Sequence, residues 1–393
     1  MSKGLMAPSR ARDGQWTCRW CGSSSAMVVL DLGLQPASDQ FPRPTDPEPD
    51  PLHPLAMVQC DRCHLAQLET DPTTPDEPRG AEPRALVAQA KDAIARIAAA
   101  ELLPVEGALL EHRSPHGGSW IPELTARGLS EVDAGPADVV VDAFGMMHDA
   151  DQRAALRSRD DELGPAGLLF LQFHSVAANL RQEMWNALRH GHFAYYSTPV
   201  VVAMAKELGL DAIGAWEFDL YGGTVMLAFT RTGVRSLRVD RLIERETELG
   251  VLDPLIVSGL QTSVTASVVA IRRYLDECAS AGLTMAGYGA ASRSVALLAM
   301  AGVGPADLVG IGDASPTKIG RCLPGARIPV ISAQQLVDLR PDRVLLFVPD
   351  LLDEVRAALP DIELDGGRWV VLNPHPTVVP PVNASVAWTR SWS

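Results

Sequence analysis

Four cysteines near the start of the chain are spaced in a way that suits a metal ion. Cys18 and Cys21 form one pair and Cys60 and Cys63 a second, each with two residues between its members. Such a pair places two thiolates on one side of a tight turn, and four thiolates complete the tetrahedral shell of a structural zinc ion. The 38 residues between the pairs exceed the about 15–20 that are usual in a zinc ribbon. We therefore expect zinc to hold an irregular, proline-rich lobe; the alternative is four reduced thiols without a metal.

The charge of the chain argues against a nucleic-acid partner. There are 34 basic and 48 acidic residues, a net charge of −14, which repels a phosphate backbone unless basic residues are concentrated locally. Residues 1–70 hold six Lys or Arg against eight Asp or Glu. The cysteine-containing segment therefore lacks the basic stripe of a nucleic-acid-binding module.

Apolar patterning and cysteine usage predict a cytoplasmic protein without a membrane partner. No apolar run reaches the about 18 residues of a membrane-spanning helix, and the first residues lack the apolar segment of a signal peptide. Six cysteines in 393 residues are too few for a secreted disulfide framework. The sequence makes no prediction of the oligomeric state.

A strand–turn–helix pattern near residue 290 is typical of a nucleotide site. The apolar strand Leu283–Gly287 leads through a turn with a second glycine, Gly289, into a helix over Ser294–Ala301. Glycines let backbone N–H groups approach a phosphate at a helix N-terminus, and Arg293 is placed to pair with that phosphate. The alternative is a tight turn that only packs.

An acidic residue follows this turn at the distance expected of a ribose-hydroxyl acceptor. Asp313 ends the next predicted strand, Asp307–Asp313, about where nucleotide-binding folds place that acceptor. A weaker strand–loop–helix pattern lies earlier, where the strand Ala108–Glu111 runs into residues 114–119 and a helix over Trp120–Arg127.

The length predicts two to three domains, at about 150 residues each. An acidic, proline-rich stretch over 71–83 separates the first, and an arginine-rich stretch after Arg231 introduces the last, which opens with a long helix over Leu255–Ala281. Between them we expect strands at Asp138–Phe144 and Ala166–Phe173, and a helix with Thr198 as N-cap. A final hairpin over residues 212–230 fits a methyltransferase-type Rossmann variant better than a dehydrogenase. The predicted domains are 1–75, 84–234 and 235–393.

These segments together resemble the three-domain sugar-nucleotide C-methyltransferases. That family joins a zinc-binding lobe, an S-adenosylmethionine domain of the methyltransferase Rossmann type, and a C-terminal Rossmann-like α/β domain; in this chain we expect the Rossmann domain of the middle to be shortened. The resemblance is carried by both cysteine pairs together with Asp31–Pro36, His190–His192, Tyr221–Thr224, Gly287–Ala291, Asp313–Gly320 and Pro324-Gly325.

The resemblance implies methylation of a nucleoside-diphosphate keto-sugar at a carbon next to its ketone. Such a reaction needs removal of a proton alpha to the carbonyl, which a base with a pKa near neutrality does best. His192 matches the family's base. The implied catalytic residues are His192, His190 and Tyr195; the implied cofactor-binding residues are Glu111, Ser114, Gly117 and Asp133; and the implied substrate-binding residues are Gly222, Gly223, Tyr288, Arg293, Asp313 and Lys318.

The chain departs from the family at two places that bear on catalysis. Arg189 and Gly191 stand where the family has Tyr and Glu in its Tyr-His-Glu-His pattern, and Arg113 stands where the cofactor loop has glycine. Only 20 residues separate Gly117 from Asp138, so the middle domain is short. Two alternatives stay open: a paralogue that binds a sugar nucleotide or a partner protein without methyl transfer, and a nicotinamide-dependent oxidoreductase that uses the Gly287 turn.

Overall fold

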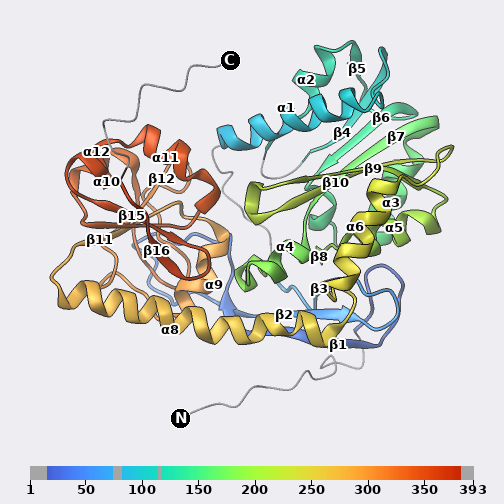
Figure 1. The fold of residues 1–393 in the computed structure, drawn as a ribbon. Coiled ribbons are helices and arrows are strands. Elements are labelled where there is room, and N and C mark those ends of the chain that lie inside the picture. Colours follow the sequence, from blue (N-terminus) through green and yellow to red (C-terminus); the bar gives the residue numbers. More distant parts are fainter. Residues whose placement is uncertain (1–15, 74–81, 114–116, 382–393) are drawn as a thin grey trace.

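The computed structural model describes residues 16–73, 82–113 and 117–381. It contains three sheets, one in an N-terminal lobe, one in a middle unit and one in a C-terminal unit. Figure 1 shows the blue lobe beside both larger units, with the long helix α8 running beneath them. This mixed α/β architecture confirms the predicted fold class.

The lobe sheet is antiparallel and borrows its last strand from the middle of the chain. Its order is β1-β2-β3-β8, and β3 pairs with β8 through Ala66 opposite Tyr195. Tyr195 follows His192 by three residues, so the lobe and the predicted catalytic segment share backbone hydrogen bonds. The strands are β1 (Ala26–Pro36), β2 (Leu52–Cys60), β3 (Ala66–Leu68) and β8 (Ala194–Tyr195).

Side chains of strand β2 point alternately to the two faces of the lobe sheet, and each face packs against one of the larger units. Ala56 and Val58 join the core of the middle unit, whereas their neighbours Leu55 and Met57 join the core of the C-terminal unit. This is the period-two alternation of a strand that is buried on both faces. The lobe is therefore a wedge between the larger units.

The proline-rich segment between the cysteine pairs is irregular and docks on the C-terminal unit. The carboxylate of Asp50 lies 2.6 Å from the Arg327 guanidinium and accepts a 2.6 Å hydrogen bond from Gly325 N. Arg321 donates to the carbonyl of Phe41 at 3.1 Å. The segment has no helix or strand over 41–51, as its proline content predicts.

The middle sheet has the strand order β5-β4-β6-β7-β10-β9. Its first four strands are parallel, and β10 runs antiparallel to both β7 and β9, which confirms the predicted hairpin. Among the described residues between β4 and β6, one short helix and one strand, α2 and β5, are present, so the middle unit is short as expected. The strands are β4 (Gly107–His112), β5 (Leu129–Glu131), β6 (Ala137–Ala143), β7 (Leu163–His174), β9 (Asp211–Phe218) and β10 (Thr224–Thr230).

Helices cover both sides of the middle sheet (Figure 1). Helices α1 and α2 lie on one side, and α3, α5 and α6 lie on the other. These helices, with the shorter α4 and three 3-10 turns, are α1 (Arg84–Ala99), α2 (Ile121–Thr125), α3 (Gln152–Asp161), α4 (Val176–Arg181), α5 (Thr198–Glu207), α6 (Leu237–Glu248), η1 (Met146–His148), η2 (Trp185–Ala187) and η3 (Leu220–Gly222).

Two details of these helices differ from the sequence-based prediction. The N-cap of α5 is Ser197, and Thr198 is the first helical residue; the buried carboxylate of Glu246 accepts hydrogen bonds from Thr198 N (2.7 Å) and Oγ1 (2.9 Å). Glu246 belongs to α6, which packs on α5 and β9. The middle unit therefore physically continues to Glu248, past the boundary that the polar stretch suggests.

The C-terminal sheet has the order β13-β12-β11-β14-β15-β16, parallel except for β16. Strand β12 begins at Ile311, later than predicted, because Asp307 accepts a hydrogen bond from Gly304 N and pairs with Arg272 in a turn. The elements are β11 (Met285–Tyr288), α9 (Ser292–Met300), β12 (Ile311–Asp313), β13 (Val330–Ser332), α10 (Ala333–Asp338), β14 (Arg343–Leu346), η4 (Pro349–Leu351), α11 (Leu352–Ala358), α12 (Asp361–Leu364), β15 (Arg368–Leu372) and β16 (Pro376–Val378).

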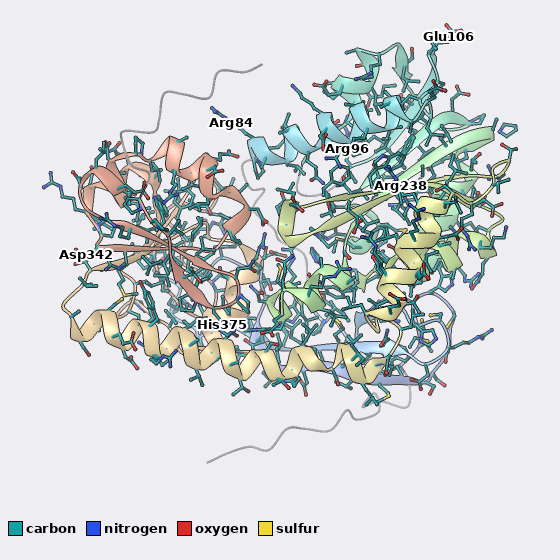
Figure 2. All side chains as sticks on the ribbon, viewed as in Figure 1. Arg84, Arg96, Glu106, Arg238, Asp342 and His375 are labelled. Carbon is teal, nitrogen blue, oxygen red and sulfur yellow. The ribbon has the colours of Figure 1, made fainter. Side chains whose placement is uncertain are left out.

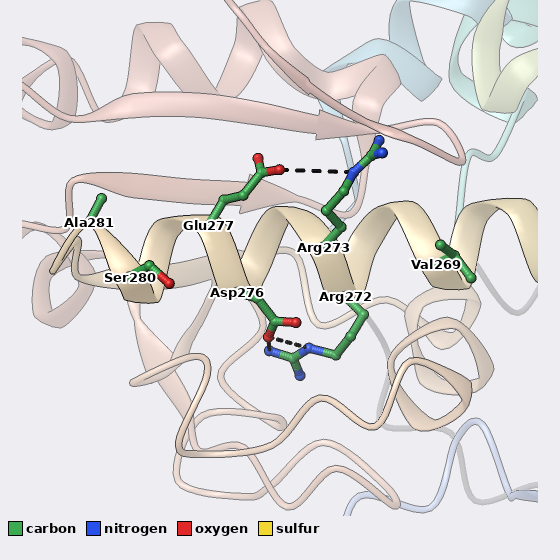
Figure 3. A pocket seen from close by; sticks show the side chains of 7 residues that line it. All are labelled: Val269, Arg272, Arg273, Asp276, Glu277, Ser280 and Ala281. Carbon is green, nitrogen blue, oxygen red and sulfur yellow. Dashed lines mark hydrogen bonds and ion pairs between the residues drawn. The ribbon is translucent and has the colours of Figure 1, made fainter.

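The long helix predicted before this sheet is two helices, α7 (Pro254–Val257) and α8 (Gly259–Ser280). Among the described residues, the segment Pro254–Ser280 alone has the length and composition of a membrane span, with a mean hydropathy of 1.5 over an 18-residue window. Its apolar residues include Leu260, Val264 and Ile271, which are buried in the core of the C-terminal unit, and a core helix meets the same criterion. A hollow of about 740 Å³ lies against the outer face of α8. Figure 3 shows the side chains that line it, with the ion pairs Arg272–Asp276 and Arg273–Glu277.

Candidate active site and metal centre

The four predicted metal ligands come together at one end of the lobe. The Sγ atoms of Cys18, Cys21, Cys60 and Cys63 all lie within 4.8 Å of one another. The Cys18–Cys63 and Cys21–Cys60 Sγ distances are 3.5 and 3.6 Å. Zinc–sulfur bonds of about 2.3 Å in a tetrahedron require sulfurs about 3.8 Å apart, so the cluster fits a zinc ion after a small expansion.

Local backbone geometry explains why each cysteine pair forms a knuckle. Gly22 donates from its backbone N to the carbonyl of Cys18 at 3.0 Å, and His64 does the same to Cys60 at 3.0 Å. Both residues have positive φ, 69° and 60°, which turns the chain back over its own thiols. Hydrogen bonds from the neighbouring thiols hold the pKa of Cys18 far below its ordinary value, so a thiolate forms readily here.

A cavity of about 220 Å³ lies between the middle and C-terminal units. Its walls include His192 and Tyr195 from the middle unit and Arg293 and Lys318 from the C-terminal unit, four of the residues that the sequence singled out. Lys318 is buried; its Nζ donates to the carbonyl of Ala290 at 3.0 Å and lies 5.0 Å from the ring centre of Phe41. No residue that lines this cavity in the described chain is acidic, so it suits an anionic ligand.

Other predicted catalytic and substrate residues lie near the cavity without lining it. His190 is turned toward the lobe, where its Nε2 lies 3.1 Å from the carbonyl oxygen of Pro54. Asp313 accepts from Ala290 N and Ser315 N, both at 2.7 Å, so its carboxylate shapes the turn after β11. The ring of Tyr288 packs edge-on against Trp369.

Gly222 and Gly223 bring to the cavity a tyrosine that the sequence analysis named only as part of a motif. A side chain at Gly223 would lie 2.5 Å from Ala178 Cβ, and one at Gly222 would lie 2.4 Å from Met184 Sδ. Both have positive φ, so glycine is required for this close turn. The turn places Tyr221 on the cavity wall, with Arg293 5.8 Å from its ring centre.

Three histidines surround the reacting end of the cavity. The ring centres of His148 and His174 lie 4.8 and 6.1 Å from that of His192. Burial, and then the nearby Arg189, lower the pKa of His148 to about 3; burial and then Arg293 lower the pKa of His174 to about 3. Both are therefore neutral near pH 7 and are weak bases.

The side chain of Arg189 contacts His192 directly. Its Nε lies 2.8 Å from His192 Nε2, and its Nη2 also contacts that atom. Its Nη1 donates to Ser292 Oγ and lies 3.7 Å from Asp39 Oδ1. Arg189 therefore links the lobe, the middle unit and the C-terminal unit within one side chain.

The segment that carries these residues is fixed from several directions. The Tyr195 hydroxyl accepts from Arg189 N at 3.0 Å and donates to Arg189 O at 3.2 Å. Burial raises the pKa of this phenol, so it stays neutral. Gly191 donates from N to the Asp71 carboxylate at 2.6 Å, and its carbonyl accepts from His148 Nδ1 at 3.0 Å.

The predicted cofactor loop follows β4 and carries several acceptors. Glu111 binds Trp120 N (2.5 Å) and Ser119 Oγ (2.6 Å), and the exposed Glu82 accepts from Gly118 N at 3.1 Å. Gly117 and Gly118 both have positive φ. Ser114 lies outside the described residues.

The side chain of Arg113 does not cover the edge of the middle sheet at which the predicted cofactor loop lies. It pairs with Glu131 at 3.2 Å, and both side chains are largely exposed, at 71% and 45%; such a pair contributes about 0–1 kcal/mol. Asp133 on the same side is also exposed. These carboxylates suit the ammonium and ribose hydroxyls of S-adenosylmethionine, so the residues present fit that cofactor.

The sequence analysis did not place Asp39 or Ser292 in the site, named Tyr221 only within a motif, and recorded Arg189 only as a departure. His174 ends β7, and ligands bind at the carboxyl ends of parallel strands, so strand position is a usable signal for it. Asp39 lies in a loop, and only the folded structure brings it to Arg189.

Two family models match this chain, one over its N-terminal part and one over its C-terminal part. Residues 219–374 match the family model described as the C-methyltransferase C-terminal domain, and residues 18–77 match the one described as "Putative zinc binding domain". Both descriptions agree with the resemblance drawn from the motifs of these two parts of the chain.

One relative that matches this chain is itself named a C-methyltransferase. C-methyltransferase NovU of Streptomyces niveus is 28% identical over 225 residues, which are 55% of this chain and 52% of that protein. The chain thus matches about half the length of that relative.

Solved structures resemble part of the chain at low similarity. Magnesium protoporphyrin IX methyltransferase from Synechocystis PCC 6803 is 11% identical and covers 38% of this chain and 85% of its own, with a TM-score of 0.29. N-methyltransferase NodS from Bradyrhizobium japonicum is 14% identical; the match covers 38% of this chain and 88% of that chain, with a TM-score of 0.27.

Proposed function

We propose that the protein is an S-adenosylmethionine-dependent C-methyltransferase of a nucleoside-diphosphate keto-sugar, with His192 as the base. The observation that carries the proposal is the shared cavity, whose lining includes His192, Arg293 and Lys318. A base and an anion site in one cavity are what enolisation of a diphosphate-linked ketone requires. The match of residues 219–374 to a C-methyltransferase domain supports the same class.

His148 and His174 are poor candidates for the base, although both lie beside His192. The pKa values of His148 and His174 are lowered to about 3, and general-base catalysis is most efficient when the pKa is close to the working pH. His148 instead donates from Nδ1 to the carbonyl of Gly191. That contact orients the backbone beside His192.

Arg293 and Lys318 form the proposed diphosphate site. Arg293 lies at the start of α9 and pairs with Asp350 at 3.5 Å, with both side chains mostly buried. Buried cations hydrogen-bond phosphate oxygens strongly because little water competes. In this site Tyr221 supports the Arg293 guanidinium with its ring.

Glu82, Glu111 and Glu131 would hold the cofactor at the edge of the middle sheet. When bound there, S-adenosylmethionine supplies an electrophilic methyl group on a sulfonium. Its ammonium and ribose hydroxyls are donors, and the three carboxylates are acceptors. Gly117 and Gly118 keep the backbone of this loop free of side chains.

The cavity must widen to admit both molecules. Its volume of about 220 Å³ is below the about 300–1,000 Å³ of most ligand pockets. The C-terminal unit closes on the middle unit through Glu354, which accepts from Arg84 N and Ala85 N at 3.2 Å, and through Asp350, which accepts from Gly222 N at 3.1 Å. Figure 2 shows Arg84 at the end of α1 that faces the C-terminal unit. We propose that these contacts separate when ligands enter.

The second candidate function is a binding protein that holds a sugar nucleotide without transferring a methyl group. The short segment between β4 and β6 and the Arg113–Glu131 pair at the cofactor edge favour it. Calorimetric titration with S-adenosylmethionine and its demethylated product separates the two. The methyltransferase binds both, and no heat with either, alongside stabilisation by thymidine diphosphate, would establish the binding protein instead.

The proposed compartment is the cytoplasm. All six cysteines are free thiols, and the cytosol keeps thiols reduced and able to bind zinc.

A further inference from the structure

Arg189 is the charged group closest to the proposed base. It is 7% exposed, and its Nε lies 2.8 Å from His192 Nε2. A guanidinium only donates hydrogen bonds, so His192 Nε2 is the acceptor and carries no proton. The lone pair that would remove a proton from the sugar is therefore covered by Arg189 in this conformation.

The base can act only after Arg189 turns to another acceptor. The substrate brings one, because the ketone oxygen lies beside the carbon that loses its proton. Standard bond lengths place that oxygen about 2.4 Å from the alpha carbon, and Arg189 and His192 are direct neighbours. Once Arg189 has turned from His192, one ketone can present its oxygen to Arg189 and its alpha hydrogen to His192.

We propose that Arg189 is a catalytic residue that covers His192 in the free protein, moves to the ketone oxygen when the sugar binds, and stabilises the enolate. This inference rests on the proposed function. It assigns a role to the residue that stands where the resembling family has tyrosine.

The electrons and protons balance in this step. The alpha C–H bond breaks, its proton passes to His192 Nε2, and its electron pair forms the carbon–carbon double bond of the enolate. The carbonyl π pair moves to oxygen, where Arg189 faces the new negative charge. The enolate carbon then bonds to the methyl group of a sulfonium donor, whose sulfur leaves as a neutral thioether.

The contacts of Arg189 support a small, guided movement. Ser292 Oγ and Asp39 hold the Nη1 side, while Tyr195 holds the backbone. The Nε and Nη2 side, which faces His192, is the part that must turn. A cation that is already inside a buried site stabilises a developing oxyanion with little reorganisation of water.

Exchange of the alpha proton tests the catalytic role without a methyl donor. A thymidine-diphosphate 4-keto-6-deoxy sugar is incubated with the protein in deuterium oxide, and deuterium uptake is measured at saturating sugar. We expect Arg189→Gln to lower the exchange rate about 10²–10³-fold, the usual loss of one oxyanion donor. Arg189→Lys keeps the charge and recovers part of the rate. Arg273→Gln, on the exposed face of α8, is the matched control and exchanges like the wild type.

Chemical modification tests the covering of His192 separately. Diethylpyrocarbonate attacks an uncovered neutral histidine, so His192 should react several-fold faster in Arg189→Gln than in wild type, with His375 as the internal reference. Zinc content and the unfolding midpoint verify that each variant is folded. If the wild type exchanges the alpha proton and Arg189→Gln exchanges it at the same rate, the catalytic role of Arg189 is wrong while the proposed function stands. A wild-type protein that binds the sugar and shows no exchange would overturn the proposed function, while equal modification rates would overturn the covering.

Discussion

The carboxylate of Asp71 accepts a hydrogen bond from the backbone N of Gly191 at 2.6 Å. Asp71 follows the last lobe strand, and Gly191 lies between the two histidines of the catalytic segment. Gly191 also has a positive φ of 81°, which a larger residue would adopt only with strain. The lobe therefore sets the position of His192 through the backbone, in addition to the pairing of β3 with β8.

We expect Asp71→Ala to impair catalysis without removing zinc. The loss of a charged acceptor leaves Gly191 N unpaired and costs about 1–3 kcal/mol of unfolding free energy. Alpha-proton exchange should fall because His192 loses its position. Asp71→Asn keeps an oxygen acceptor and should retain most of both quantities, so equal losses in the two variants would contradict this account.

The sequence predicted the three units because each has its own strong local signal. Cysteine spacing marked the metal centre, and the apolar runs marked β6 and β7. The glycine turn and Asp313 were recognised as a motif, yet the structure shows Asp313 binding the backbone of Ala290 and Ser315. The motif located the turn correctly, but it did not reveal that the Asp313 carboxylate already accepts two backbone hydrogen bonds.

What escaped prediction depends on contacts between distant segments. Strand β8 has two residues and exists only because β3 lies beside it. Asp39 meets Arg189 because the lobe is wedged between the larger units, and no local pattern encodes that meeting. The substitution of Tyr by Arg at position 189 was visible in the sequence, whereas its contact with His192 required the fold.

Removing one zinc ligand should destabilise the lobe. Cys60 is fully buried in the cluster, and breaking a buried metal site belongs to the most destabilising classes of substitution. We expect Cys60→Ser to reduce zinc well below one equivalent per chain and to lower the unfolding midpoint. Cys278→Ser, which changes a buried thiol outside the cluster, should keep its zinc. Unaltered metal content in Cys60→Ser would remove the four-cysteine assignment.

Acid should weaken the fold through the two buried histidines. The pKa of His148 and of His174 falls from 6.5 to about 3 on folding, so the unfolded chain binds more protons between those values. Their stabilising contribution is complete above pH 6.5 and is lost as the pH falls toward 3, by about 1.4 kcal/mol per pH unit for each histidine.

Denaturant unfolding at pH 7.5, 6.0 and 5.0 measures this slope. We expect the unfolding free energy of His174→Gln to change less steeply with pH than that of the wild type, because one histidine fewer takes up a proton on unfolding. Burial raises the pKa of Glu246, which contributes with the opposite sign, so the comparison is made between variant and wild type. His375→Gln replaces a side chain that is 42% exposed and should leave the slope unchanged; an equal slope in His174→Gln would show that His174 titrates normally.

Arg293 should control the affinity for the nucleotide rather than the enolisation step. Its guanidinium lies on the cavity wall, far along the chain from the His192 segment, and pairs with Asp350 at 3.5 Å. A hydrogen bond from a charged donor contributes about 1.5–3 kcal/mol, so Arg293→Ala should weaken binding of thymidine diphosphate roughly 10- to 100-fold by calorimetry. Arg273→Ala on the outer face of α8 removes an arginine of the same charge and should bind as wild type does. Equal affinity in Arg293→Ala would move the diphosphate away from α9 and leave Lys318 as the cation that holds it.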